Sequence, residues 1–193
     1  QLPAGARKRA DLAGTEVARL ERLLADILLY AKPLTLKRAS LDLAELVRDT
    51  VAAECPEQAD FAVASADCPP ILADADRLRQ VLINLLRNAV QASPAGSAVR
   101  IECNTLGGDW VELQVSNRGE PIPHDDLERI FEPFFTSKSR GTGLGLAIVR
   151  RIVHAHGGEI SLKSDLERGT RAILRLPTAP VPAGNTGTET PSS

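Results

Sequence analysis

The stretch from Phe131 to Val149, FEPFFTSKSRGTGLGLAIV, decides how this chain of 193 residues is interpreted. It joins an aromatic segment to a loop of Ser, Lys and Arg, and then passes through Gly141, Gly143 and Gly145 into an apolar helical pattern. Glycines before a helix let the backbone come close to a ligand, and the free N–H groups of a helix N-terminus attract anions. The stretch therefore predicts a phosphate-binding loop.

A second candidate element lies upstream, in a helical pattern from Asp74 to Ala92. Apolar residues recur there every three or four positions, which predicts a side that faces a core. Asn84 and Asn88 are four positions apart and therefore share one helical face. Taken alone, the pair favours solvent exposure or capping of a neighbouring strand. The alternative is that the two amide oxygens face a cation or a nucleotide.

Together these motifs resemble the ATP-binding catalytic domain of bacterial sensor histidine kinases. The N box of that family matches Asn84 to Ala89, its F box matches Phe131 to Phe135, and its G2 box matches Gly141 to Gly145. His156-Gly157-Gly158 after the last predicted helix also fits the family. The resemblance covers roughly Glu16 to Pro177, and its strength comes from the joint order of several motifs.

The resemblance implies an α/β fold, a two-layer sandwich in which a mixed sheet carries helices on one face and is preceded by a bundle helix. It implies a protein-histidine kinase that binds ATP and Mg²⁺ and transfers the γ-phosphoryl group to a histidine. The tail of the N box, Asn88-Ala89-Val90-Gln91-Ala92, is most similar to the nitrogen-regulation and pilus-regulation branch.

One motif departs from the family pattern. The G1 box of the family reads Asp-x-Gly-x-Gly, whereas this chain has Asn117-Arg118-Gly119-Glu120-Pro121-Ile122-Pro123. An Asn oxygen still accepts a hydrogen bond from the adenine amino group, but without the charge assistance that a carboxylate provides. Pro121 fixes its own φ and removes a donor, which predicts a stiffer loop. The departure bears on adenine affinity and selectivity.

The resemblance also implies roles for single residues, with Asn84 and Asn88 as the catalytic pair. Asn88 supplies an oxygen ligand to Mg²⁺, which shares its octahedral shell with phosphates and needs few protein ligands. Asn84 supports the metal or the phosphates. Hydrolytic relatives carry a Glu there, and an Asn lacks the basicity to activate water, which favours phosphotransfer over hydrolysis. The implied nucleotide contacts are Asn88, Gln91, Asn117, Gly119, Ile122, Phe131, Thr136, Lys138, Gly141, Thr142, Gly143, Leu144 and Gly145.

The ATP lid of the family corresponds here to a very short segment, from about Thr136 to Thr142. A loop of this composition has few apolar contacts, so we expect it to be mobile without nucleotide. Lys138 is the expected phosphate contact, and Arg140 is explained equally well by simple exposure. Arg87 and Gln91 either reach phosphates or are solvated.

Composition bounds the remaining possibilities. The net charge of −2 gives no reason to expect nucleic acid or an anionic membrane surface as a partner. No apolar run approaches the length of a bilayer span, and the N-terminus does not look like a signal peptide. The three cysteines are scattered and suggest a reduced cytoplasmic setting, with each acting as a packing residue. The full-length protein is compatible with membrane anchoring.

The predicted organisation begins with a helix over residues 10–31. Its apolar positions step by three and four, as in a helix bundle, and EVARLERLLADILLYAKP resembles the second helix of the kinases' dimerisation and histidine-phosphotransfer hairpin. An ordinary surface helix is the alternative. We expect a partial hairpin at 1–33, a linker at 34–40, the catalytic ATP-binding domain at 41–177 and a disordered tail at 178–193. Further helices are predicted at 43–54, 74–92, 125–130 and 144–156, and strands at 61–66, 99–103, 110–116, 159–164 and 170–176.

The phosphate acceptor is not expected among the histidines of this chain. His124 follows the G1-like loop, and His154 and His156 fit capping positions at a helix C-terminus. In the family the acceptor lies on the first hairpin helix, so the resemblance places it before Gln1. It also implies a homodimer in the full-length protein and a cognate response regulator. The alternatives are a degenerate regulatory or dimerisation domain, which the G1 departures support, and an ATP-driven machine of the gyrase or chaperone type.

Overall fold

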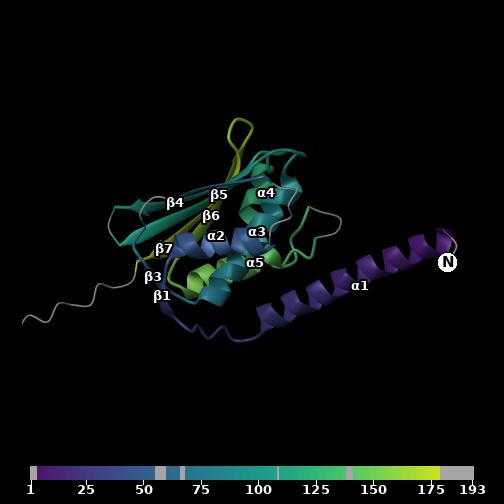
Figure 1. Ribbon diagram of the computed structural model, residues 1–193, viewed down its shortest axis with the longest axis horizontal. Helices are drawn as coiled ribbons and strands as arrows, with labels where there is room; N and C mark the ends of the chain where they lie inside the picture. The colour runs from purple at the N-terminus through teal and green to yellow at the C-terminus, as the bar shows by residue number, and fades with distance from the viewer. Residues whose placement is uncertain (1–3, 55–59, 66–67, 108, 138–140, 179–193) are drawn as a thin grey trace, which may run out of the picture.

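The computed structural model describes residues 4–54, 60–65, 68–107, 109–137 and 141–178. A long first helix extends away from a compact part that holds the sheets and the other helices (Figure 1). The helices are α1 (Ala4–Ala31), α2 (Leu43–Glu54), α3 (Ala75–Ala92), α4 (His124–Arg129) and α5 (Gly145–Ala155). The strands are β1 (Ala39–Leu41), β2 (Phe61–Ser65), β3 (Ile71–Ala73), β4 (Val99–Leu106), β5 (Trp110–Asn117), β6 (Glu159–Asp165) and β7 (Gly169–Pro177).

The main sheet is mixed, as predicted. Its strand order is β2-β4-β5-β7-β6, in which β2 pairs with β4 in parallel and the other neighbours are antiparallel. Along β5, buried residues alternate with partly exposed ones, so one face turns to the core. Helices α2, α3 and α5 pack on that face (Figure 1), which confirms the two-layer α/β arrangement.

The core is built almost entirely from aliphatic side chains. Leu82, Ile101, Val111, Leu144 and Val149 are among those with no more than 1% exposure. The low aromatic content of the chain, 3%, leaves Leu, Val, Ile and Ala to fill the space between helices and sheet.

A small second sheet was not predicted. Strand β1 pairs antiparallel with β3, and it begins inside the segment expected as a linker. Each of these strands has only three residues, too few for an alternating pattern to emerge from the sequence.

Helix α1 has a large exposed apolar surface. Leu20 and Leu24 are 61% and 58% exposed, and other apolar side chains of this helix are similarly open. At its C-terminus the Arg151 guanidinium of α5 donates to the carbonyl oxygens of Leu29, Tyr30 and Lys32. These bonds satisfy carbonyl groups that lack partners inside the helix. Among the described residues, no helix is both long and apolar enough to cross a membrane.

The N-terminus of α3 is tied to the C-terminus of α5 through Asp74 and His156. Asp74 is the N-cap, and its carboxylate accepts from the backbone N–H groups of Arg77 and Lys37 at 3.1 and 2.8 Å. Its own N–H donates to Nε2 of His156 at 3.0 Å. His156 Nδ1 lies 2.8 Å from the Ile152 carbonyl oxygen, to which it donates. His156 therefore lies at the expected capping position, but it is a buried neutral side chain that connects the ends of α3 and α5, and not a cation.

We expect the hydrogen bonds of His156 to make the free energy of unfolding depend on pH. Burial lowers the pKa of His156, helped by the Arg38 charge and opposed by the Ile152 hydrogen bond and the Asp74 charge. Because the unfolded chain binds the proton more readily, the stabilisation is present above about pH 6.5 and is lost as pH falls through the lower folded pKa. Urea unfolding at pH 8 and pH 5.5 measures this. His156→Ala should lose about 1–3 kcal/mol at pH 8 and flatten the pH dependence.

His154→Ala is the matched control, because His154 is exposed on the same helix. Equal pH dependence in the parent and in His156→Ala would remove His156 as its source. Burial opposes ionisation of Asp74, but the hydrogen bonds from the Lys37 and Arg77 N–H groups and the Arg77 charge outweigh it, so the Asp74 pKa is also lowered. Its contribution is lost only as pH falls below the ordinary Asp range near 3.8, so the two effects separate.

Two of the scattered cysteines meet in the fold, which the sequence did not predict, and both contribute to packing: Cys103 is buried in the core and Cys68 packs against it. The Sγ atoms of Cys68 and Cys103 lie 3.2 Å apart. Burial, the Cys68 thiol and the Asp42 charge raise the pKa of Cys103 to about 12, so this thiol stays protonated. Cys55 lies outside the described residues.

Candidate nucleotide-binding site

A cavity of about 910 Å³ opens between α3, the loop after β5, the N-terminus of α5 and the core face of the sheet. It brings together motifs that lie far apart in the sequence. The predicted site residues that line it are Asn84, Asn88, Gln91, Asn117, Ile122, Thr136, Gly141, Thr142, Gly143 and Gly145. Arg87, which was considered as a phosphate contact, also lines it.

Three predicted contacts do not line this cavity. Gly119 sits where a Cβ atom would lie 2.1 Å from the carbonyl oxygen of Ala92, so its role is a close approach of two backbones. Phe131 is buried with the Arg150 guanidinium 5.7 Å from its ring centroid. Leu144 is fully buried in the core. These three residues support the loops and helix around the cavity without lining it. Lys138 lies outside the described residues.

The two asparagines of α3 occupy different environments. Asn84 is 7% exposed, and its Nδ2 donates to the Gly145 carbonyl oxygen at 3.4 Å, which links α3 to the start of α5. The solvent-exposed interpretation is therefore wrong for Asn84. Asn88 is half-buried on the cavity wall, and within the described part of the chain its amide has no hydrogen-bond partner. Its oxygen is thus available to a ligand.

The glycine-rich loop ends at a helix N-terminus suited to anions. Helix α5 has 11 residues, and its N-cap Leu144 makes no side-chain capping bond. Its first N–H groups lack intrahelical partners and carry positive partial charge, and Gly145 and Leu146 line the cavity there. Gly143 has φ +68°, and a Cβ atom there would lie 2.4 Å from the Phe134 carbonyl carbon. Only glycine fits that position.

Thr142 connects this loop to α1. Its hydroxyl donates to the Asp26 carboxylate at 3.1 Å and accepts from the Leu144 N–H at 3.3 Å. Asp26 and Glu16 of α1 both line the cavity. This contribution of acidic groups from α1 was not predicted, because nothing in the sequence shows which face of α1 turns to the loop.

The sheet forms the opposite wall with two rows of side chains. The pairing aligns Val115 with Ala172 and Ala172 with Leu162, and these three apolar residues line the cavity. The next row toward the loop begins with Asn117, which pairs with Thr170. Apolar surface beside a polar edge is the combination that a planar heterocyclic base requires.

Asn117 is buried at the end of β5, with 7% exposure. Its Nδ2 donates to the Arg118 carbonyl oxygen at 3.5 Å, which leaves Oδ1 as the acceptor. Sequence reasoning found Asn117 but missed Thr170, Ala172 and Leu162. The strands carrying them were predicted, but their register was not, and register decides which residues meet.

Known proteins identify this arrangement. Residues 73–180 match the family described as histidine kinase-, DNA gyrase B- and HSP90-like ATPase. The chain belongs to this family. The chain is 38% identical over 182 residues to the sensor histidine kinase ZraS of Escherichia coli O157:H7, and the match covers 91% of this chain and 40% of ZraS. It is 32% identical over 169 residues to sporulation kinase E of Bacillus subtilis, covering 84% of this chain and 23% of that protein.

Solved structures agree with the assignment to this ATPase family. The catalytic domain of the histidine kinase ThkA matches with a TM-score of 0.68 and 35% identity, over 75% of this chain and 97% of that domain. Full-length ShkA in complex with AMPPNP matches with a TM-score of 0.79 and 31% identity, over 93% of this chain and 40% of ShkA. The chain thus spans less than half of ZraS, sporulation kinase E and ShkA.

Proposed function

We propose that this chain is the catalytic part of a sensor histidine kinase, which binds Mg-ATP and passes the γ-phosphoryl group to a histidine on another segment. The observation that carries the proposal is the single cavity onto which the Asn88 amide, the buried Asn117 and the N-terminus of α5 open together. The base lies against the sheet near Asn117, and the phosphates lie at the glycine loop. Related kinases named as such support the assignment.

The residues present fit a magnesium ion at Asn88. Its amide oxygen is a hard, neutral ligand on the cavity wall, and Mg²⁺ takes its remaining oxygens from phosphates and water. When bound, the ion would neutralise phosphate charge. In this arrangement Asn88 holds the metal ion. Asn84 keeps α3 and the start of α5 in fixed relative positions through its bond to the Gly145 carbonyl oxygen. The N–H groups at the start of α5 orient the phosphates. Such a site acts by positioning and charge neutralisation.

Two alternatives are less well supported. A degenerate regulatory domain gains support from Asn117 and Pro121, yet the cavity keeps its polar groups in place. A gyrase-type or chaperone-type machine needs a basic group to activate water. Asn84 has no such basicity, and its amide is already bonded to the Gly145 carbonyl.

The wider context follows from the same proposal. We propose the division expected from the sequence: 1–33 as part of a dimerisation and phosphotransfer hairpin, 34–40 as a linker, 41–177 as the catalytic domain and 178–193 as a tail. Residues 1–3 and 179–193 lie outside the described residues. The exposed apolar side chains of α1 suit a helix bundle in a homodimer. This chain is similar to ThkA in its solved complex with the response regulator TrrA, with a TM-score of 0.79. That similarity supports a response regulator as the partner. We also propose a cytoplasmic location, and the nitrogen-regulation and pilus-regulation branch.

The chain incubated alone with γ-labelled ATP is expected to acquire no acid-labile phosphate. His156 is buried and bonded on both ring nitrogens, and neither His124 nor His154 lines the cavity. A helical hairpin that carries an acceptor histidine, added in trans, should become labelled. The control is the same hairpin with its acceptor histidine replaced by alanine, which should remain unlabelled. Phosphohistidine mapped to His124 or His154 would contradict an acceptor outside this chain.

A further inference from the structure

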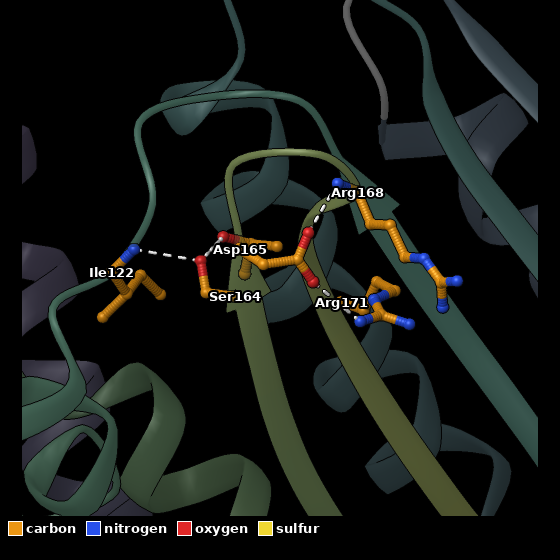
Figure 2. A network of polar contacts seen from close by, with 6 residues as sticks. Ile122, Ser164, Asp165, Arg168 and Arg171 are labelled. Atoms are coloured by element: carbon orange, nitrogen blue, oxygen red, sulfur yellow. Dashed lines mark hydrogen bonds and ion pairs between the residues drawn. The ribbon is translucent and has the colours of Figure 1, made fainter.

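The hairpin between β6 and β7 is bonded to the loop that follows β5 (Figure 2). Ser164 Oγ accepts a hydrogen bond from the backbone N–H of Ile122 at 2.9 Å. The same Ser164 oxygen lies 2.7 Å from Oγ1 of Thr170, so the two hydroxyls share a second hydrogen bond. Ile122 lines the nucleotide cavity and Ser164 does not, which places Ser164 one contact behind the cavity wall.

These residues form one row across three neighbouring strands. Asn117 of β5 pairs with Thr170 of β7, and Thr170 pairs with Ser164 of β6. Residues paired directly across a sheet point to the same face. The row that begins with the buried Asn117 therefore ends with the hydroxyl that holds Ile122, so the sheet fixes the distance between Asn117 and the loop wall.

The sequence around Ile122 leaves the loop few other anchors. Ile122 stands between Pro121 and Pro123, and proline has no backbone N–H. The Ile122 N–H is therefore the only backbone donor of this tripeptide, and Ser164 takes it. Because Ile122 is half-buried, an N–H left without this acceptor would be poorly compensated by water.

The hairpin itself is held rigidly enough to act as an anchor. The Asp165 carboxylate accepts from the Arg168 N–H at 2.6 Å and from the Arg171 guanidinium at 3.0 Å. Gly169 has φ +72°, and a Cβ atom there would lie 2.2 Å from the Asn117 carbonyl oxygen. The turn thus closes directly against the end of β5, and Figure 2 shows Asp165 bridging its two sides.

We propose that Ser164 is a positioning residue for the nucleoside: through the Ile122 N–H it fixes the Pro121-Ile122-Pro123 wall of the cavity, and so sets nucleotide affinity without taking part in phosphoryl transfer. This inference rests on the proposed nucleotide site. It does not involve the phosphate end, where the loop at Thr142 and the Asn88 amide lie.

The test compares Ser164→Ala with Ser164→Thr and Ser161→Ala. Threonine keeps the hydroxyl on a strand position that suits a β-branched residue. Ser161 is exposed on the same strand, three positions away and so on the opposite face, which makes it the matched control. Fluorescent ATP and ADP analogues give dissociation constants and binding stoichiometry. Amide hydrogen exchange at Ile122 reports the bond directly.

Ser164→Ala is expected to raise the dissociation constants for ATP and ADP by the same factor, about 5–10-fold, with unchanged stoichiometry and faster exchange at Ile122. Transfer to an added acceptor hairpin at saturating ATP should stay within about twofold of the parent. Ser164→Thr and Ser161→Ala should both match the parent. An unchanged dissociation constant in Ser164→Ala, or a lower stoichiometry at unchanged affinity, would overturn the positioning role. A parent chain that binds no ATP would instead refute the nucleotide site, whereas the Ile122 exchange would still test the contact.

Discussion

Replacing Asn88 with alanine is expected to abolish Mg-dependent ATP binding while leaving the chain folded. The Asn88 amide faces the cavity and is the metal ligand that we propose, so its removal deprives Mg²⁺ of its oxygen from α3. Alanine has a higher helix propensity than asparagine, and the side chain is only half-buried. Titration of a fluorescent ATP analogue with and without Mg²⁺ measures the effect, and urea unfolding checks the fold.

The control for this experiment is Asn104→Ala, which removes an exposed amide on β4 away from the cavity. It should bind ATP like the parent. If Asn88→Ala retained the parent's affinity and its dependence on Mg²⁺, Asn88 would have to be removed from the site.

Replacing Asn117 with leucine is expected to raise the dissociation constant for ATP by about 5–150-fold. Leucine has a similar size but cannot accept the amino hydrogen bond of adenine, and an unpaired buried donor costs roughly 1–3 kcal/mol. Asn117→Asp restores the carboxylate of the family pattern and should keep or strengthen binding. The same fluorescence titration compares the three proteins. Parent-like affinity in the leucine variant would mean that residue 117 does not read adenine.

The parts of the fold that could be predicted are those with long, regular patterns. Helices α2, α3 and α5 were expected within one residue of their observed ends, because their apolar residues repeat at helical spacing over ten or more positions. The five strands of the main sheet were also expected. That this sheet is mixed was expected from the family resemblance, but the order of its strands was not predicted, since alternation alone does not show which strands pair.

What escaped prediction depends on contacts between distant segments. Cys68 and Cys103 meet only because the segment before β3 lies beside β4, and the sequence separates them widely. His156 was expected at a helix end, but its bond to the Asp74 N–H requires the α3–α5 geometry. Likewise, the position of Thr170 beside Asn117 is a matter of register. Most of the residues predicted from sequence motifs line the cavity, whereas the wall formed by Leu162, Thr170 and Ala172 was not predicted.

The hydrogen bond between Thr142 and Asp26 has a thermodynamic consequence. Thr142 belongs to the loop that lines the cavity, and Asp26 belongs to α1. Any ligand that alters this bond on binding changes the free energy with which α1 docks on the catalytic part. Linkage then requires reciprocity, so the docking of α1 changes the ligand's affinity by the same factor. A force or signal that shifts α1 would therefore change nucleotide occupancy. The ratio of the nucleotide affinities with α1 docked and undocked would give the coupling free energy.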